Sequence, residues 1–501
     1  MALVAATALL ATGCGGGGGG SGGSEASSEL VLGGILAPAT LDANNMNWGN
    51  QSIYAQAVYD SLLRADPNGV DVKPGLATEW EYNEDKTVLT LTLRNDVTFS
   101  DGTKLTADVA AKNLLRFKDG SSPQRTKAAN VKSAKAVDDT TLQITLGYAD
   151  PAFLVYLTQA PGLVESADVF DNPDIATNPV GSGPYTLDTA STVVGTSYTF
   201  KKNPKYWDPT IQYYDTLTVK VFTDNTSMLN ALRGKQLNAA ALADNSILPQ
   251  VEQAGYKTNP LLLSMVGLYL WDREGKLNPA LGDVRVRQAI NHAVDTQGLL
   301  ETVALGYGEL TQQPFRPQSA AFDESLNSTY SYDPAKAKQL LAEAGYENGF
   351  DLTMPTNPAN PQSLIALIQQ QLGDVGIRVT FTDVGQNLIP DIQAAKFAAS
   401  YFQLQQDPVD SQLINFMIAP NATWNPFKYS DPKANALIER VRAGGADAST
   451  AAKELNNYVV EQAWFNPWYT VQTSFMTDDK TQVTVNQDNA YPYLQDIKPA
   501  T

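Results

Sequence analysis

Cysteine and histidine are almost absent from this chain of 501 residues. Cys14 is its only cysteine, and His292, its only histidine, lies inside an expected helix. A single cysteine excludes a disulfide within the chain. A single histidine leaves little from which to build a serine–histidine–aspartate triad or a zinc site. We therefore expect no catalytic residue, no metal and no cofactor.

Positive charge is scarce as well. The sequence holds 35 Lys and Arg against 53 Asp and Glu, which gives a formal net charge of −18. An acidic surface without a basic stripe repels the phosphate backbone of nucleic acids. We therefore expect no nucleic-acid partner.

Long apolar runs are also missing, since a membrane-spanning helix needs about 20 such residues. Residues 2–10 form a short apolar stretch, and small residues then lead to Cys14. This pattern resembles a lipobox, where a bacterial lipoprotein is acylated on cysteine and cleaved just before it. Glycines and serines follow and favour a flexible tether. We expect 1–13 to be a signal peptide, 14–29 a lipoprotein tether, and Cys14 the lipidation site.

The start of the sequence differs from a typical secretory signal in one respect. Such signals begin with positive charge, but no Lys or Arg precedes Cys14. We therefore expect translation to begin upstream of Met1. The alternative is an apolar terminus that carries an unmodified thiol.

The length and the periodicity predict a mixed α/β protein of several domains. Chains beyond about 250–300 residues usually divide into more than one core, and 43% hydrophobic residues suffice to build them. Alternation and helical spacing identify the elements. The expected strands are 29–36, 87–93, 141–146, 217–221 and 377–381, and the expected helices are 51–63, 107–117, 226–234, 283–294, 335–344, 361–373, 431–442 and 451–463.

An ordered series of short motifs spans nearly the whole chain after the lipobox. The motifs are Tyr59-Asp60-Ser61-Leu62-Leu63, Lys73-Pro74-Gly75-Leu76-Ala77-Thr78-Glu79-Trp80, Phe99-Ser100-Asp101-Gly102-Thr103, Val180-Gly181-Ser182-Gly183-Pro184-Tyr185, Asn203-Pro204-Lys205-Tyr206-Trp207, Asp283-Val284-Arg285-Val286-Arg287-Gln288-Ala289-Ile290 and Tyr332-Asp333-Pro334-Ala335-Lys336-Ala337. In this order the chain resembles the large solute-binding proteins of ABC importers (solute-binding family 5). Members of this family handle oligopeptides, dipeptides, nickel and some oligosaccharides.

The resemblance implies a two-lobe clamp of the periplasmic-binding-protein type II (cluster C), with an extra inserted α+β domain. Lobe I would consist of 30–64, 180–282 and 472–501, the inserted domain II of 65–179, and lobe II (domain III) of 283–471. The chain would cross between the lobes near 271–283 and 468–475. Lobes that close over a solute bury it and present a shape that a membrane partner can recognise.

Residues 400–410 depart from the family pattern, which runs aromatic, two residues, aspartate, two residues, Asp-Pro. Matching Asp407-Pro408 to the final pair places Tyr401 at the aromatic position. Leu404 then falls at the acid that peptide-binding members use for the α-amino group of the ligand. Leucine cannot neutralise an ammonium group, and an unpaired one is costly to bury. This departure disfavours short peptides, whereas long peptides held through their backbone remain compatible.

The cleft implied by the resemblance is rich in amides and aromatic rings. Neutral polar groups beside indole rings suit solutes rich in hydroxyl or amide groups, because pockets combine apolar walls with a few polar anchors. The alternative for each tryptophan is a place in the core. The candidate ligand-binding residues are Asn44, Asn45, Asn47, Trp48, Trp271, Asp272, Tyr401, Gln403, Leu404, Gln405, Gln406, Asp407, Trp424 and Asn425.

The resemblance implies an extracytoplasmic solute-binding lipoprotein, lipid-anchored to the bacterial cell membrane. It would capture an oligopeptide or similar polar solute by hinge closure and deliver it to the transmembrane subunits of an ABC permease. We expect it to act as a monomer and not as an enzyme. The first alternative is a receptor for an oligosaccharide or another neutral polar solute. A secreted hydrolase is the second, and a chemosensory or adhesion lipoprotein built on the same clamp is the third.

Overall fold

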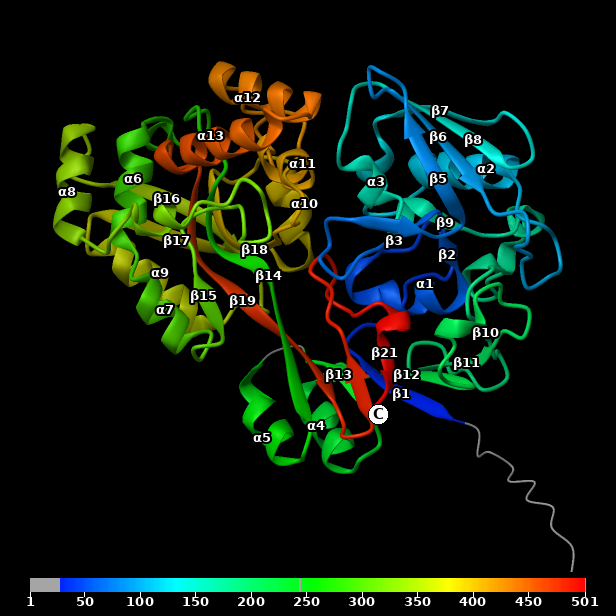
Figure 1. The fold of residues 1–501 in the computed structure, drawn as a ribbon. Coiled ribbons are helices and arrows are strands. Elements are labelled where there is room, and N and C mark those ends of the chain that lie inside the picture. The colour runs from blue at the N-terminus through cyan, green and yellow to red at the C-terminus, as the bar shows by residue number, and fades with distance from the viewer. Residues whose placement is uncertain (1–27, 243–244, 501) are drawn as a thin grey trace, which may run out of the picture.

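Two lobes joined by a pair of long strands make up the fold (Figure 1). The computed structural model describes residues 28–242 and 245–500. Helices and strands alternate along the chain, and the main sheet runs through both lobes. The expected two-lobe α/β class is therefore confirmed.

Nine strands form the main sheet. In lobe I its spatial order is β10 (Tyr185–Leu187), β11 (Ser197–Lys202), β12 (Thr216–Val221), β1 (Glu29–Gly34) and β13 (Ala239–Ala241). The sheet continues through β19 (Phe465–Thr477) and β14 (Lys257–Leu270) to β18 (Ala399–Gln405), and β15 (Gly308–Leu310) pairs with β19. Strand β1 runs parallel to β12 and β13, whereas the other neighbours are antiparallel. Helices α4 (Asn225–Arg233) and α5 (Leu248–Gln253) pack beside β13.

The two long strands β14 and β19 connect the lobes. They pair with each other over nearly their whole length. In lobe I, β13 pairs with the end of β19, and in lobe II, β18 pairs with the second half of β14. Register shifts at 262–264 and 266–267 interrupt the ladder between the two strands. Such irregularities bend and twist a strand pair, and here they lie where the chain passes between the lobes.

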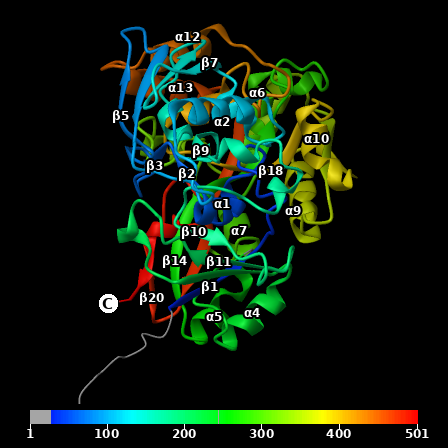
Figure 2. The ribbon, with the colours of Figure 1, turned by 90° about the vertical axis from the view of Figure 1, so that its right-hand side faces the viewer.

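A four-stranded antiparallel sheet forms the inserted domain beside lobe I. Its order is β5 (Ala77–Tyr82), β6 (Val88–Leu93), β8 (Thr141–Leu146) and β7 (Val131–Ala136). Helix α2 (Ala107–Asp119) crosses this sheet, as Figure 2 shows, and the Thr106 side chain accepts the Val109 N–H at its start. That bond satisfies one of the unpaired donors at a helix N-terminus. Apolar residues of both parts form one continuous core.

Lobe II places helices on both faces of its strands. Strands β16 (Phe350–Thr356) and β17 (Ile377–Asp383) pair in parallel. One core contains residues of α6 (Val284–Ala293), α7 (Thr296–Thr302), α8 (Pro334–Glu343) and α9 (Gln362–Gly373). The other contains residues of α10 (Leu388–Gln393), α11 (Asp410–Leu413), α12 (Pro432–Ala443) and α13 (Ala448–Glu461).

Short elements complete lobe I and the inserted domain, and they correct one expectation. They are α1 (Ser52–Val58), β2 (Asp60–Ser61), β3 (Leu63–Ala65), β4 (Val72–Pro74), α3 (Phe153–Tyr156), β9 (Leu163–Val164), β20 (Thr481–Val483) and β21 (Ile497–Pro499). The helix expected over 51–63 is wrong beyond Val58, because the following residues form strands. Buried Asp60 explains the change, since its carboxylate accepts hydrogen bonds from Ser182, Tyr206 and Trp207.

Some expectations fall outside what the structure describes. Residues 1–27 hold Cys14, the expected signal peptide and nearly all of the expected tether, and they lie outside the described residues. The expected lobe boundaries stay predictions. Leu268 and Leu270 of β14 already belong to the core of lobe II. Within 28–242 and 245–500, no helix is both long enough and apolar enough to cross a membrane.

Candidate functional site

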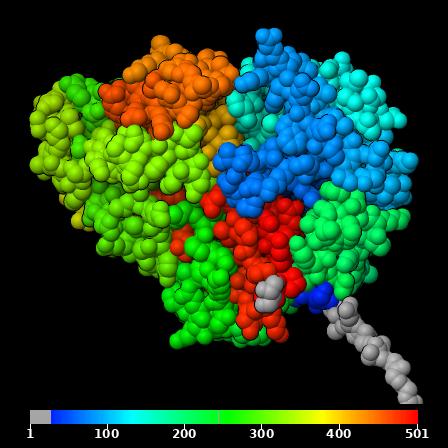
Figure 3. Space-filling model, viewed as in Figure 1, coloured from blue at the N-terminus to red at the C-terminus, as the bar shows by residue number. Residues whose placement is uncertain are grey.

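The segment that follows β18 brings lobe II into contact with lobe I. Gln405 Nε2 donates hydrogen bonds to Asp407 Oδ1 (2.9 Å) and to the backbone oxygen of Asp488 (3.0 Å), which lies in the C-terminal segment of lobe I. A Cβ built on Gly69 would lie 3.0 Å from the side chains of both Pro408 and Asp488. Figure 3 shows that the two halves of the molecule touch on the face in view. Gln405 and Asp407 therefore lie at the interface between the lobes.

Charged and amide groups from both lobes surround this contact. Asp488 accepts hydrogen bonds from the Tyr493 hydroxyl at 2.9 Å and from Gln159 Nε2 at 3.4 Å. Lys127 Nζ donates to Gln159 Oε1 at 2.6 Å. We call the following residues the interlobe polar cluster: Lys127, Gln159, Gln405, Asp407 and Asp488.

Burial dominates the electrostatics of the interlobe polar cluster. Loss of water raises the pKa of Asp488 and lowers the pKa of Lys127. Asp407 and Asp488 oppose that lowering, because negative charge favours the protonated amine. Asp488 Oδ1 is buried and has no hydrogen-bond partner in the described part of the chain. The cluster therefore has hydrogen-bonding capacity that its own residues do not use.

A second feature between the lobes is a cavity of about 530 Å³ beside the connecting strands, which we call the hinge pocket. Its lining residues are Leu242, Asn245, Ser246, Val266, Val303, Ala304, Leu305, Ala359, Pro361, Tyr401, Gln403, Tyr469, Val471, Gln472 and Thr473. None of these residues is charged. Apolar walls with a few amide and hydroxyl groups are typical of small-solute sites.

The hinge pocket holds its polar side chains in defined positions. Tyr401 stacks on Trp468 with ring centres 5.5 Å apart, and burial raises the pKa of Tyr401 to about 12. Asn245 Nδ2 donates to the backbone oxygen of Gln472 at 2.8 Å, and Gln472 Nε2 donates to Ser474 Oγ at 2.9 Å. Lobe I thus contributes hydrogen-bonded amide groups to the same pocket that the β18 side chains line.

The two faces of β18 have different surroundings. Tyr401 and Gln403 line the hinge pocket. Leu404, by contrast, is 4% exposed and belongs to the core of lobe II beneath α11 and α12. Gln406 is fully buried and donates to the backbone oxygen of Pro314 at 2.7 Å. The strand therefore separates the candidate residues into a cavity-lining set and a core set.

Four other candidates, two of them from the 180–282 stretch expected to belong to lobe I, are buried in the interior of lobe II. Trp271 and Trp424 stack with centroids 6.0 Å apart, and Trp271 Nε1 donates to Ser400 Oγ at 2.9 Å. The Asp272 carboxylate accepts the backbone N–H groups of residues 276–278. Asn425 Nδ2 donates to the backbone oxygen of Tyr429 at 2.8 Å. These contacts organise lobe II and do not reach the hinge pocket lining.

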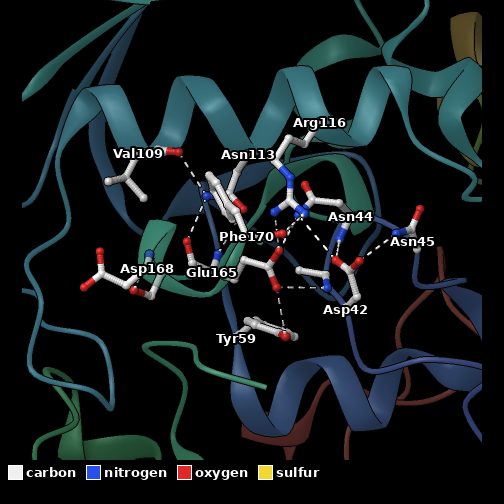
Figure 4. Close-up of polar contacts among 12 residues, drawn as sticks. Asp42, Asn44, Asn45, Tyr59, Val109, Asn113, Arg116, Glu165, Asp168 and Phe170 are labelled. Atoms are coloured by element: carbon white, nitrogen blue, oxygen red, sulfur yellow. Dashed lines mark hydrogen bonds and ion pairs between the residues drawn. The ribbon is translucent and has the colours of Figure 1, made fainter. Parts of the chain in front are cut away.

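The candidate residues 44–48 of lobe I also have different surroundings. Asn44 and Asn45 both donate to Asp42, and Asn44 also donates to Glu165 in a buried network (Figure 4). Asn47 is half-buried. Trp48 is 4% exposed, its ring lies 6.4 Å from that of Tyr493, and its Nε1 has no hydrogen-bond partner within the described ranges. Trp48 is linked to the interlobe polar cluster through Tyr493, whose hydroxyl donates to Asp488.

Several residues at the interface escaped the sequence analysis. Lys127, Gln159 and Asp488 come from distant parts of the chain, so no local spacing joins them. The signal that could have drawn attention to Asp488 is the polar run 486–489, Asn-Gln-Asp-Asn, which contrasts with its apolar neighbours. His292 Nδ1 lies 2.8 Å from the Ser331 backbone oxygen, away from this interface. In the part of the chain that the structure describes, no group of three His, Cys, Asp or Glu could hold a metal ion.

Comparison with known proteins gives a consistent result. The model of bacterial extracellular solute-binding proteins, family 5, matches residues 71–431. The glutathione-binding protein GsiB of Escherichia coli O1:K1 is 29% identical over 358 residues, which cover 69% of this chain and 68% of the relative. The heme-binding protein A of Haemophilus influenzae is 30% identical over 360 residues, which cover 65% and 64%.

Solved structures share the fold over nearly the full length. The periplasmic binding protein DppA of Helicobacter pylori, in complex with the peptide STSA, superposes with a TM-score of 0.79 at 20% identity, covering 95% of this chain and 99% of that one. HbpA2 of Haemophilus parasuis gives a TM-score of 0.80 at 22% identity, covering 94% and 100%. At these identities the likeness concerns the fold alone.

Proposed function

The chain belongs to family 5 of the bacterial extracellular solute-binding proteins, and on this basis we propose that it captures an oligopeptide or similar polar solute between its lobes. It then delivers the solute, chemically unchanged, to the permease of an ABC importer. The observation that carries this proposal is the hinge pocket, whose walls come from both lobes. A site shared by two lobes couples binding to their closure, because a solute that contacts both favours the closed arrangement.

The connecting strands support a hinge at this place. The lobes are linked through β14 and β19, and the pairing of these strands is irregular at 262–264 and 266–267. A few residues at such a junction can absorb the change in backbone angles that closure requires. Tyr469, Val471 and Thr473 of β19 line the hinge pocket, so movement at the hinge changes the shape of the site directly.

The uncharged lining favours a second ligand class within the same function. Amide, hydroxyl and tyrosine groups suit an oligosaccharide or another neutral polar solute as well as a peptide backbone. Leu404, buried in the core of lobe II, offers no charge to an ammonium group. A neutral polar solute is therefore the second candidate.

Binding of a co-purified solute tests the proposal. Native mass spectrometry of protein purified from its own host should reveal a bound small molecule, and calorimetry with that molecule should give one site. Tyr401→Ala should weaken binding about tenfold, the equivalent of about 1.4 kcal/mol. Tyr332→Ala, which removes a 51% exposed ring on lobe II, is the matched control. Chemical turnover of the solute would instead favour a secreted hydrolase.

We also propose that lipid on Cys14 tethers the protein outside the cytoplasm, where it acts as a monomer. The support is the lipobox and the glycine-rich segment that follows it. Cys14→Ser should shift the protein from the membrane fraction to the soluble fraction of the host. Continued association of the variant with membranes would contradict this tether.

A further inference from the structure

Arg316 is a buried cation whose hydrogen-bonding groups are largely unused. It lies in the loop after β15 and is only 2% exposed. Its Nη1 donates to the backbone oxygen of Leu262 on β14 at 2.9 Å. Its Nε and Nη2 have no hydrogen-bond partner among the described residues. These two nitrogens form one edge of the planar guanidinium, the edge that can hold a carboxylate through two parallel hydrogen bonds.

Two other buried arginines show how this protein otherwise satisfies such a group. Arg287 is 3% exposed and donates to the backbone oxygens of Leu281, Gly282 and Gln462. Arg273 also has unpaired nitrogens, but its guanidinium lies over the ring of Trp464 at 4.8 Å and near two further aromatic rings. Such rings attract a cation. Within the described residues, Arg316 has neither the several backbone oxygens that surround Arg287 nor the aromatic rings that surround Arg273.

The surroundings of Arg316 include the interlobe polar cluster, whereas Arg316 is not among the residues that line the hinge pocket. Asp407 and Asp488 of the interlobe polar cluster act on its charge, but neither forms an ion pair with it in the described chain. Burial outweighs both and lowers the pKa of Arg316 to about 10. Because the group is buried, its charge acts over a longer range than an exposed charge would.

A cavity borders this arginine. It measures about 300 Å³ and lies between the loop that carries Arg316 and the connecting strands, which contribute Leu262 and Thr470. Glu309 and Glu324 also line it, but both are exposed. Water screens their charges far more than that of Arg316. The cavity therefore offers space next to a cation that forms no ion pair within residues 28–242 and 245–500.

We propose that Arg316 binds a carboxylate of the captured solute, which makes it a specificity-determining residue of the interlobe site. This inference rests on the proposed function and adds that the solute carries a negative group. The carboxylate would take both N–H donors of the Nε–Nη2 edge while Nη1 keeps its bond to Leu262. Closing the lobes on such a solute would supply the partner that the polypeptide itself does not.

Paired probes test the proposal on the full chain. Native mass spectrometry is run with a mixture of tri- to pentapeptides with free C-termini and with the same mixture amidated at the C-terminus. A sugar acid and its neutral parent sugar form a second pair. The wild-type protein should retain the acid member of a pair at least tenfold better than the neutral member. Arg316→Met should abolish this preference, whereas Arg378→Met, which removes an exposed cation of lobe II, should preserve it.

Thermal unfolding without solute separates recognition from a structural role. Arg316→Met should lower the melting temperature little, because replacing a buried charge with an apolar side chain of similar length offsets the loss of the hydrogen bond to Leu262. Equal retention of acid and neutral probes would overturn the role of Arg316 and leave the proposed function standing. A lower melting temperature with an unchanged acid preference would also overturn it, since Arg316 would then only fasten its loop. Retention of no probe and no host solute would contradict the proposed function itself.

Discussion

Two buried charges in this protein have opposite surroundings. Glu165 is fully buried, and its carboxylate accepts hydrogen bonds from Arg116 at 2.9 Å, from Asn44, from the Ala43 backbone N–H at 3.3 Å and from the Tyr59 hydroxyl at 3.3 Å (Figure 4). Arg316 is almost as buried but makes a single hydrogen bond among the described residues. Glu165 thus has several partners from the polypeptide, whereas most of the Arg316 guanidinium has none in the described chain.

The difference follows from where each charge lies. The partners of Glu165 all come from lobe I and the inserted domain, which share one core. They can therefore stay together whatever the lobes do. Arg316 lies where the lobes meet, so a permanent partner there would occupy the space that a solute needs. A buried charge paired within one core serves the fold, whereas one left unpaired between two lobes can serve recognition.

Replacing arginine by methionine at position 116, beside Glu165, and at position 316 tests this difference most directly. Arg116→Met leaves the Glu165 carboxylate buried without its ion pair, and breaking such a pair costs about 4 kcal/mol of unfolding free energy. Arg316→Met should cost no more than about 1 kcal/mol, the net value of its hydrogen bond to Leu262. Urea denaturation at pH 8 measures both. Lys112→Met, which removes an exposed cation from the same helix α2, is the control. The comparison fails if Arg116→Met is no more destabilising than that control.

The protonation of Glu165 should have the second largest effect on the unfolding free energy. Burial, followed by the charge of Asp42, raises its pKa to about 7, although Arg116 opposes the shift. The folded state then holds this proton more tightly than the unfolded state between about pH 4.5 and 7. Its contribution to stability is therefore complete below about pH 4.5 and is lost as pH rises through 7, on the order of 3 kcal/mol in total. In Glu165→Gln, the unfolding free energy should lose this part of its pH dependence. A curve parallel to that of the wild type would contradict the assignment.

The sequence predicted the fold well where elements carry local signals. Strand 141–146 and helix 361–373 have clear periodicity, and both form within one residue of the expected bounds. The long strands β14 and β19 were not predicted. Pro260 lies inside β14 and disfavours a strand in the sequence, and the apolar residues of β14 run together near the lobe junction because both faces are buried. Such a run does not distinguish a strand from a buried helix.

The site was predictable only in part, for a physical reason. Tyr401 and Gln403 line the hinge pocket, and an ordered family motif led to them. The partners across the interface are distant in the sequence, since Lys127 precedes Gln405 by 278 residues and Asp488 follows it by 83, and only tertiary packing brings them close. For the other candidate residues, burial in the core determines whether the side chain can contact a solute. The large ring of Trp424 could pack against a solute or in the core, and the sequence does not reveal that it stacks on Trp271 in the core.

Asn415 lies in a third region between the lobes, where a substitution should have the smallest effect. Asn415 of lobe II donates to Asp150 of the inserted domain at 3.2 Å and accepts from Arg442 at 3.0 Å. The Arg442 guanidinium also lies 4.8 Å from the centre of the Tyr148 ring. In contrast to the groups around Arg316, Asn415 has a partner for both halves of its amide. We therefore expect these contacts to favour the closed arrangement before any solute is present.

Asn415→Ala should weaken this closure by about 1 kcal/mol, the net value of a typical hydrogen bond. Because solute affinity depends on the population of the closed form, binding should weaken about fivefold. Calorimetry with the co-purified solute measures the affinity, and small-angle X-ray scattering should show a larger radius of gyration in the absence of solute. Asn435→Ala, an exposed amide on α12, is the matched control. An unchanged affinity together with an unchanged radius would mean that these contacts follow closure and do not promote it. The energy that holds the lobes together would then come from the solute, through the groups that the polypeptide leaves unpaired.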